Sequence, residues 1–152
     1  MKKGYEDRST FIAFDATQSP FRNNVIPIIT TFLGLQNILK PDDIVLELKR
    51  ICTNRFYSIS SFCPENDSVN NEVLEKFGID KMWIKGKNIS EFKRNGWNID
   101  IENSIIAEVK PTPMGEIVKG VGIDGFPVAD SQFEYCTMVC SVNNMKSRDM
   151  NT

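Results

Sequence analysis

The segment WNIDIENSIIAEVK, residues 97–110, constrains the fold more than any other part of the sequence. Apolar side chains recur at every second position, and acidic or polar side chains occupy most of the positions between. A period of two is typical of a β-strand with one face toward the core and the other toward water. Residues 133–142, FEYCTMVCSV, predict a last strand after a loop. We therefore expect the C-terminal half to build a mainly antiparallel sheet.

The N-terminal half predicts helices. Pro41 followed by the acidic pair Asp42 and Asp43 is typical of a helix start, and apolar residues then share one face up to residue 52. Residues 25–39 also place apolar side chains at helical spacing, although Pro27 must begin or kink that helix. The two segments together predict a helical hairpin.

Shorter elements are expected around these. Residues 56–62 and 81–86 alternate as strands do, residues 10–14 fit a short edge strand, and a short helix should begin at Ser68. Gly78 stands where a helix commonly ends in a left-handed residue. The prediction is an α+β fold, with N-terminal helices packed against a mainly antiparallel β-sheet formed largely by the C-terminal half. Residues 1–152 form one domain, with flexible tails at 1–9 and 143–152.

Residues 120–125, GVGIDG, match the pattern G-x-G-x-x-G of dinucleotide-binding loops. Such a loop must open a helix, yet Pro127 disfavours helical backbone at Phe126. Too few residues follow for a crossover helix and a second parallel strand. The glycines are therefore expected to mark a bulge and a turn, and no cofactor is predicted.

The chain contains no histidine, which removes Ser–His and Cys–His pairs and the commonest metal ligand. Its cysteines also lack the closely spaced pairs of structural zinc sites. They are predicted to be small core residues, with a zinc site or a redox thiol as alternatives, and no metal is assigned. The four are Cys52, Cys63, Cys136 and Cys140.

Residues 81–97 combine basic and aromatic side chains, as single-stranded nucleic-acid sites do. The alternative is that the tryptophans pack in the core while the basic side chains are solvated. The candidate binding residues are Lys81, Trp83, Lys85, Lys87, Lys93, Arg94 and Trp97.

Carboxylates offer a third kind of site. Asp100 and Glu102 share one face of the predicted strand, and Asp15 follows a possible strand in a segment rich in hydroxyl groups. Such groups could bind a divalent ion or transfer protons. Solvated surface acids are the alternative for all three.

No apolar leader follows the N-terminal lysines, and the most apolar stretch, residues 25–39, is too short to span a bilayer. We therefore expect a cytosolic protein whose cysteines are reduced thiols. Abundant Ile, Asn and Lys indicate an AT-rich genome, bacterial or phage, so that the location could be a host cytoplasm. The function expected first is that of a small non-catalytic interaction protein, an accessory or modulator that binds another protein. The alternatives are a single-stranded nucleic-acid-binding module and a carboxylate-based, metal-dependent enzyme.

Overall fold

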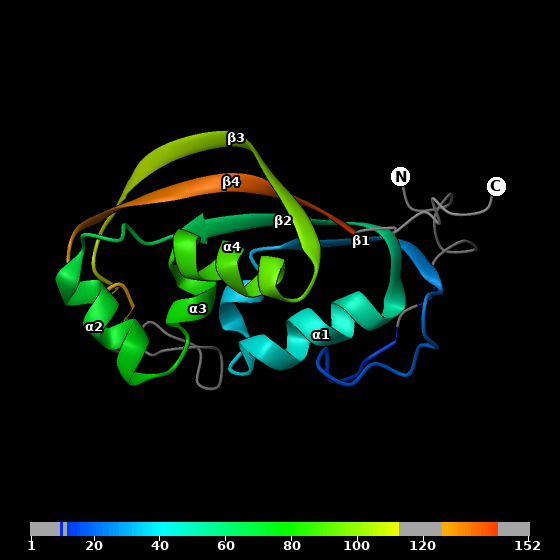
Figure 1. Ribbon diagram of the computed structural model, residues 1–152. Helices are drawn as coiled ribbons and strands as arrows, with labels where there is room; N and C mark the ends of the chain where they lie inside the picture. Colours follow the sequence, from blue (N-terminus) through cyan, green and yellow to red (C-terminus); the bar gives the residue numbers. More distant parts are fainter. Residues whose placement is uncertain (1–9, 11, 113–125, 143–152) are drawn as a thin grey trace, which may run out of the picture.

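The computed structural model describes residues 10, 12–112 and 126–142. Figure 1 shows their helices and strands. In chain order these are β1 (Ile26–Phe32), the 3₁₀ turn η2 (Leu35–Asn37), α1 (Pro41–Ile51), β2 (Cys52–Phe62), α2 (Ser68–Lys76), α3 (Asp80–Trp83), α4 (Lys85–Arg94), β3 (Trp97–Val109) and β4 (Ser131–Val142).

The strands form one mixed sheet in the order β1-β2-β4-β3. β1 and β2 are parallel, whereas β4 is antiparallel to both β2 and β3. α1 is the crossover helix that parallel neighbours require. The predicted fold is therefore wrong: helices are interspersed among the strands, and the sheet begins with a parallel pair. The antiparallel pairing predicted for residues 97–110 and 133–142 is present within this mixed sheet.

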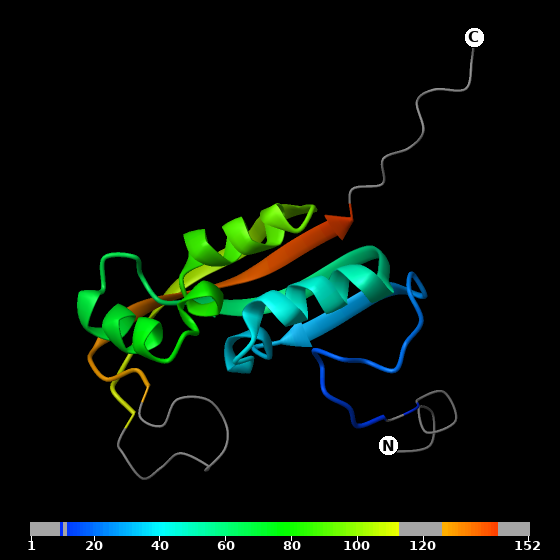
Figure 2. The same cartoon turned by 60° about the horizontal axis from the view of Figure 1, so that its bottom comes forward.

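The helices lie on one side of the sheet, as Figures 1 and 2 show from two directions. α1 and α4 run along this face, and α2 lies at the end of the sheet where β2 finishes. We call this side of the sheet the covered face and the opposite side the open face. No helix in the described part of the chain is long and apolar enough to cross a membrane.

Two predicted elements change type. Residues 26–32 form strand β1 instead of a helix, because their β-branched side chains suit a strand and β2 offers a long-range partner. Residues 81–86 lie in α3 and the first turn of α4 instead of a strand, and only Ile84 between the two helices is extended, where it bridges Cys63. The edge strand predicted at 10–14 is also absent at its described positions, 10 and 12–14.

Other local predictions are confirmed. α1 begins at Pro41 with Asp42 and Asp43 in its first turn. Gly78 has a φ of +71° after α2, although the side chain that caps α2 is Asp67, one residue before the expected Ser68. The glycine pattern at 120–125 lies outside the described residues.

The core fills the space between the covered face and the helices. Cys136, Met138 and Cys140 project from β4 into it and are at most 3% exposed. All four cysteines are buried free thiols, which confirms them as core residues. Burial raises the pKa of the Cys140 thiol to about 12.

Candidate functional site

β1 and β2 end at the same margin of the sheet. In open α/β sheets, ligands bind in the crevice outside the carboxyl ends of parallel strands. Here β1 turns through Leu33, whose φ is +51°, into η2, and β2 leads through residues 63–67 into α2. The side chains at these two strand ends therefore define the candidate site.

Gln36 lies buried at the end of β1, with only 3% of its surface exposed. Its side-chain Nε2 donates to the backbone carbonyl of Ser61 at 3.2 Å, and its backbone carbonyl accepts from Trp83 Nε1 at 2.9 Å. Its Oε1 finds no hydrogen-bond partner among the described residues. A buried acceptor left without a donor is costly, so this end of the sheet has an unfilled hydrogen-bonding position.

A polar network closes the end of β2. Asp67 accepts from the backbone N–H of Asn70 at 3.1 Å and from its Nδ2 at 2.8 Å. Asn70 in turn accepts from the backbone N–H of Val128 at 2.8 Å, which ties α2 to the segment before β4. Burial and the Asp67 carboxylate raise the pKa of the neighbouring Cys63 thiol to about 12. Cys63 is therefore a poor nucleophile near neutral pH.

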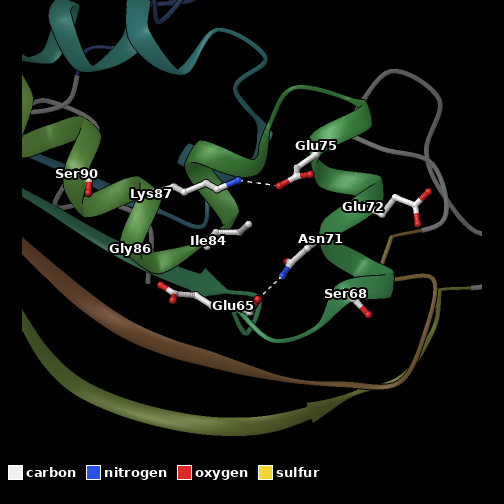
Figure 3. A pocket seen from close by; sticks show the side chains of 9 residues that line it. All are labelled: Glu65, Ser68, Asn71, Glu72, Glu75, Ile84, Gly86, Lys87 and Ser90. Atoms are coloured by element: carbon white, nitrogen blue, oxygen red, sulfur yellow. Dashed lines mark hydrogen bonds and ion pairs between the residues drawn. The ribbon is translucent and has the colours of Figure 1, made fainter.

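A polar pocket of about 660 Å³ opens beside this network, between α2 and α4 (Figure 3). We call it the acidic pocket, because its charged lining consists of three carboxylates and one lysine. These are Glu65, Glu72, Glu75 and Lys87. Ser68, Asn71 and Ser90 add polar groups, and Ile84 forms an apolar wall.

The positive charge in the acidic pocket is already paired. Lys87 Nζ lies 2.9 Å from Glu75 and 2.8 Å from Asp80. No ion pair of Glu65 or Glu72 occurs in the part of the chain that the structure describes. The pocket therefore offers hydrogen-bond acceptors and negative charge to a ligand.

Gly86 leaves room for one of these carboxylates. A Cβ at position 86 would lie 2.5 Å from Glu65 Oε1, closer than real atoms approach. Figure 3 shows the Glu65 carboxylate beside this first turn of α4, facing the pocket. Asn71 Nδ2 holds the Glu65 backbone carbonyl at 3.0 Å from the other side, so both ends of Glu65 are positioned.

A second cavity, of about 500 Å³, runs along β1 and is mainly apolar. We call it the β1 trough. Its walls come from β1, from α1 and from the segment at 14–21. Phe14 and Phe21 meet edge to face at 5.6 Å on the side away from the sheet. The trough extends the apolar core to the margin of the sheet.

The basic residues predicted to bind nucleic acid mostly pair with acids. Lys81 contacts Asp42 at 2.9 Å, and Lys85 contacts Glu134 at 2.6 Å. Lys87 is paired as described above, Arg94 lies 2.6 Å from Glu91, and Lys93 is exposed.

Neither tryptophan of that segment stands free at the surface. Trp97 is 2% exposed, and Trp83 donates to Gln36 and packs on Phe126 at 4.8 Å. The structure thus brings only Lys87 of the seven into the acidic pocket. Nucleic-acid binding by these residues stays a prediction.

The predicted carboxylates lie apart. Asp15 is exposed and accepts from the backbone and side chain of Thr17 at 2.9 and 2.7 Å, which lowers its pKa. Asp100 and Glu102 lie exposed on β3, opposite Val139 and Thr137 of β4. Among residues 10, 12–112 and 126–142, no three Cys, Asp or Glu side chains are arranged to bind a metal.

Sequence reasoning missed the acidic pocket. Its carboxylates come from the loop after β2 and from α2, whereas Gly86 and Lys87 come from α4. No short motif joins them, because they meet only through the packing of α2 beside α4. The only sequence feature that could have indicated this pocket is the group of asparagines and glutamates within residues 65–75.

The fold has counterparts among solved structures. A Bacillus halodurans protein provisionally assigned as a methyltransferase matches with a TM-score of 0.57 and 14% identity, over 86% of this chain and 75% of the other. The YcgJ protein of Bacillus subtilis matches with a TM-score of 0.56 and 12% identity, over 84% and 68%. No family model and no curated protein sequence matches. The chain thus has a Rossmann-like fold similar to that of these proteins.

This comparison corrects the expected function. A small non-catalytic interaction protein was predicted, whereas the fold is similar to that of a protein provisionally assigned as a methyltransferase. Sequence patterns could not reveal this similarity, because the matched proteins share so few residues with this chain.

Proposed function

We propose that this protein acts in methyl transfer and binds the methyl acceptor in the acidic pocket at the end of β2. The observation that carries the proposal is the fold shared with a protein assigned as a methyltransferase over 86% of this chain. The position of the pocket supports it, because ligands of open α/β sheets bind at the carboxyl ends of parallel strands. A cytosolic location is part of the proposal, since the four cysteines are free thiols.

The lining of the pocket favours a particular class of acceptor. Glu65 and Glu72 provide negative charge that no basic residue of the described chain neutralises, and Ser68 and Ser90 provide hydroxyls. Amines and guanidinium groups carry positive charge and several N–H donors, so they complement this lining. The acceptor we propose is therefore a small basic amine.

The methyl donor fits the described residues less well. S-adenosylmethionine, a common biological methyl donor, combines a flat adenine with a charged amino-acid end. The described lining of the β1 trough is mainly apolar and includes no basic side chain for a carboxylate, and the acidic pocket has only Ile84 as a large apolar wall. Neither cavity suits both ends of the donor, so we derive no step through it.

Calorimetric titration with putrescine tests the acceptor site. Binding should exceed that of the uncharged analogue 1,4-butanediol, and it should weaken as salt screens the carboxylates. Glu72→Gln removes a charge from the pocket, whereas Glu108→Gln removes one from the exposed surface of β3 and is the matched control. Equal binding of the diamine and the diol would contradict the proposed acceptor class.

Methyl transfer itself is tested with S-adenosylmethionine labelled on its methyl group. Radioactivity should appear in amine acceptors when the protein is assayed together with the proteins that co-purify with it from its own cell. An active preparation whose rate is unchanged by Glu72→Gln would place the acceptor elsewhere. Absence of transfer from every acceptor class would remove methyl transfer as the function.

A further inference from the structure

We infer that the outer edge of β1 and the adjoining open face bind a second polypeptide, an α/β segment that adds a strand parallel to β1. The docking surface rests on the fold alone. The role of that segment in holding the methyl donor rests on the proposed function.

The edge of β1 has hydrogen-bonding groups available for another strand. Leu33 N–H donates to the carbonyl of Ile59 on β2 at 2.8 Å. Because backbone groups alternate sides along a strand, the N–H groups of Phe32, Thr30 and Ile28 face away from β2. No strand pairs with this outer edge in the described part of the chain. Such an edge is a template for strand addition.

The open face is apolar next to this edge. Ile28 is 55% exposed and Phe32 72%, and Ile59 beside Phe32 on β2 is 40% exposed. Across the sheet, β3 places Glu102 on the cross-strand row of Phe32 and Ile59, and Asp100 on the neighbouring row of Thr30. Parallel strands are normally covered on both faces, whereas an antiparallel edge can be solvated on one. The missing cover therefore belongs over β1 and β2.

On the covered face, the β1 trough provides an apolar surface for the side chains of an added strand. It follows β1 along its length and is walled by Ile44, Leu48 and Ile51 of α1 and by the segment at 14–21, which an added strand would have to contact. Side chains of an added strand would alternate between this trough and the open face. One strand at the edge would therefore complete both surfaces.

The comparisons identify the kind of occupant. This chain spans 75% and 68% of the two matched proteins, so a quarter to a third of their length has no counterpart in it. A doubly wound sheet has two halves with crossover helices on opposite faces. Here the parallel pair has its crossover, α1, on the covered face alone. The occupant that fits is an α/β segment, a parallel strand with helices that pack on the open face.

The donor-binding residues would then come from the second polypeptide. Ligands of doubly wound sheets bind where the strand order reverses, and that point would lie between β1 and the added strand. Gln36 Oε1, which is buried without a partner, lies at this end of β1. A crevice shared by two chains explains why neither cavity of the described residues fits the donor.

Photo-crosslinking in the cell that makes the protein tests this surface. Benzoylphenylalanine replaces Phe32 on the proposed surface or, as the matched control, Val69 on α2, which is 54% exposed. At position 32 we expect one crosslinked peptide that belongs to another α/β chain and has the alternation of a strand followed by a helix. A crosslink to a second copy of this chain, to other residues of the same chain, or none above the Val69 control overturns the inference.

Strand pairing is tested by a proline in the same experiment. Thr30→Pro removes an outward N–H without removing a bond to β2, and should reduce the crosslink at position 32 by about tenfold. Thr30→Ser retains the N–H and should leave the crosslink unchanged. An unchanged crosslink with proline at position 30 overturns the strand-addition geometry.

The two proposals fail separately. Methyl transfer by the chain alone would overturn the donor-binding role of the second polypeptide and leave the proposed function intact. A confirmed α/β partner whose complex with this chain transfers no methyl group would do the reverse. If both proposals are correct, the complex should bind S-adenosylmethionine and the chain alone should not.

Discussion

The two faces of strand β2 differ in a way that hydrophobicity does not explain. Ser58 and Ser60 point toward the helices and are completely buried, whereas Ile59 between them points to the open face and is 40% exposed. The serine hydroxyls bond each other at 2.8 Å, and Ser60 lies 3.5 Å from Met138 Sδ. The presence of a helical cover, and not the residue type, decides which of these side chains is buried.

The largest expected difference between the faces is in packing. Phe56 is 1% exposed and lies among the rings of Phe92 and Trp97, with centroids at 6.0 and 6.3 Å. Phe56→Ala should lower the free energy of unfolding by about 3–5 kcal/mol, because it leaves a cavity. Ile59→Ala, on the open face of the same strand, should cost less than about 1 kcal/mol. Urea unfolding of both variants measures the difference, and equal losses would contradict the distinction between the faces.

The next effect concerns Glu47, at the rim of the covered face. Its carboxylate accepts from Arg50 at 2.6 and 2.7 Å and from the backbone N–H of Ser19 at 2.8 Å. Glu47→Gln should lower the free energy of unfolding at pH 7 by about 1.5–3 kcal/mol, the range for hydrogen bonds to charged groups.

The same carboxylate predicts a pH dependence. The hydrogen bonds from Arg50 lower the pKa of Glu47 to about 2, against an ordinary value of 4.5. A depressed pKa stabilises the fold above the unfolded value, so this contribution should disappear as the pH falls from about 4.5 to 2. Urea unfolding at several pH values should show a shallower loss in Glu47→Gln than in the wild type. Parallel curves for the two proteins would show that Glu47 is not the responsible group.

A smaller effect is expected at the buried serine pair. Ser60→Ala leaves the Ser58 hydroxyl without its 2.8 Å partner and should cost about 1 kcal/mol. Replacing both serines by alanine should cost less than the sum of the single changes, because no hydroxyl is then left unpaired. Strict additivity in urea unfolding would show that the two hydroxyls do not stabilise each other.

The smallest effect on stability is expected on the open face. Phe32→Thr keeps a residue suited to a strand and should change the free energy of unfolding by less than about 0.5 kcal/mol. It should nevertheless reduce the fluorescence of an apolar dye such as ANS, since Phe32 is 72% exposed. Val69→Thr on α2 is the matched control, and an equal loss of dye binding there would show that the open face is not a special surface.

Part of the fold was predictable from local sequence. Pro41 with Asp42 and Asp43 starts α1, and the alternation of residues 97–110 gives β3. Residues 28–32 show the limit of this reasoning. Their apolar spacing fits a helix, but pairing of Ile29 with Phe56 and of Phe32 with Ile59 makes them a strand. Partners so distant in sequence leave no local signal.

The candidate site was less predictable. The basic and aromatic residues of 81–97 predicted a nucleic-acid-binding surface. In the structure, Lys81, Lys85 and Lys87 each form an ion pair with an acid from another element. The acidic pocket, by contrast, depends on Glu65 and Gly86, whose proximity follows from the packing of α4 beside the loop after β2. Composition shows which charges exist, and only the fold shows which remain unpaired.

The sequence by itself determined where α1 begins, the alternation along β3 and β4, and the burial of the cysteines, because caps, periodicity and side-chain polarity act over a few neighbouring residues. The tertiary structure decided that β1 is a strand parallel to β2, that one face of the sheet is open, and that an acidic pocket forms at the end of β2. These features depend on contacts between segments far apart in the chain, whose free energy exceeds the weak local preferences of each segment.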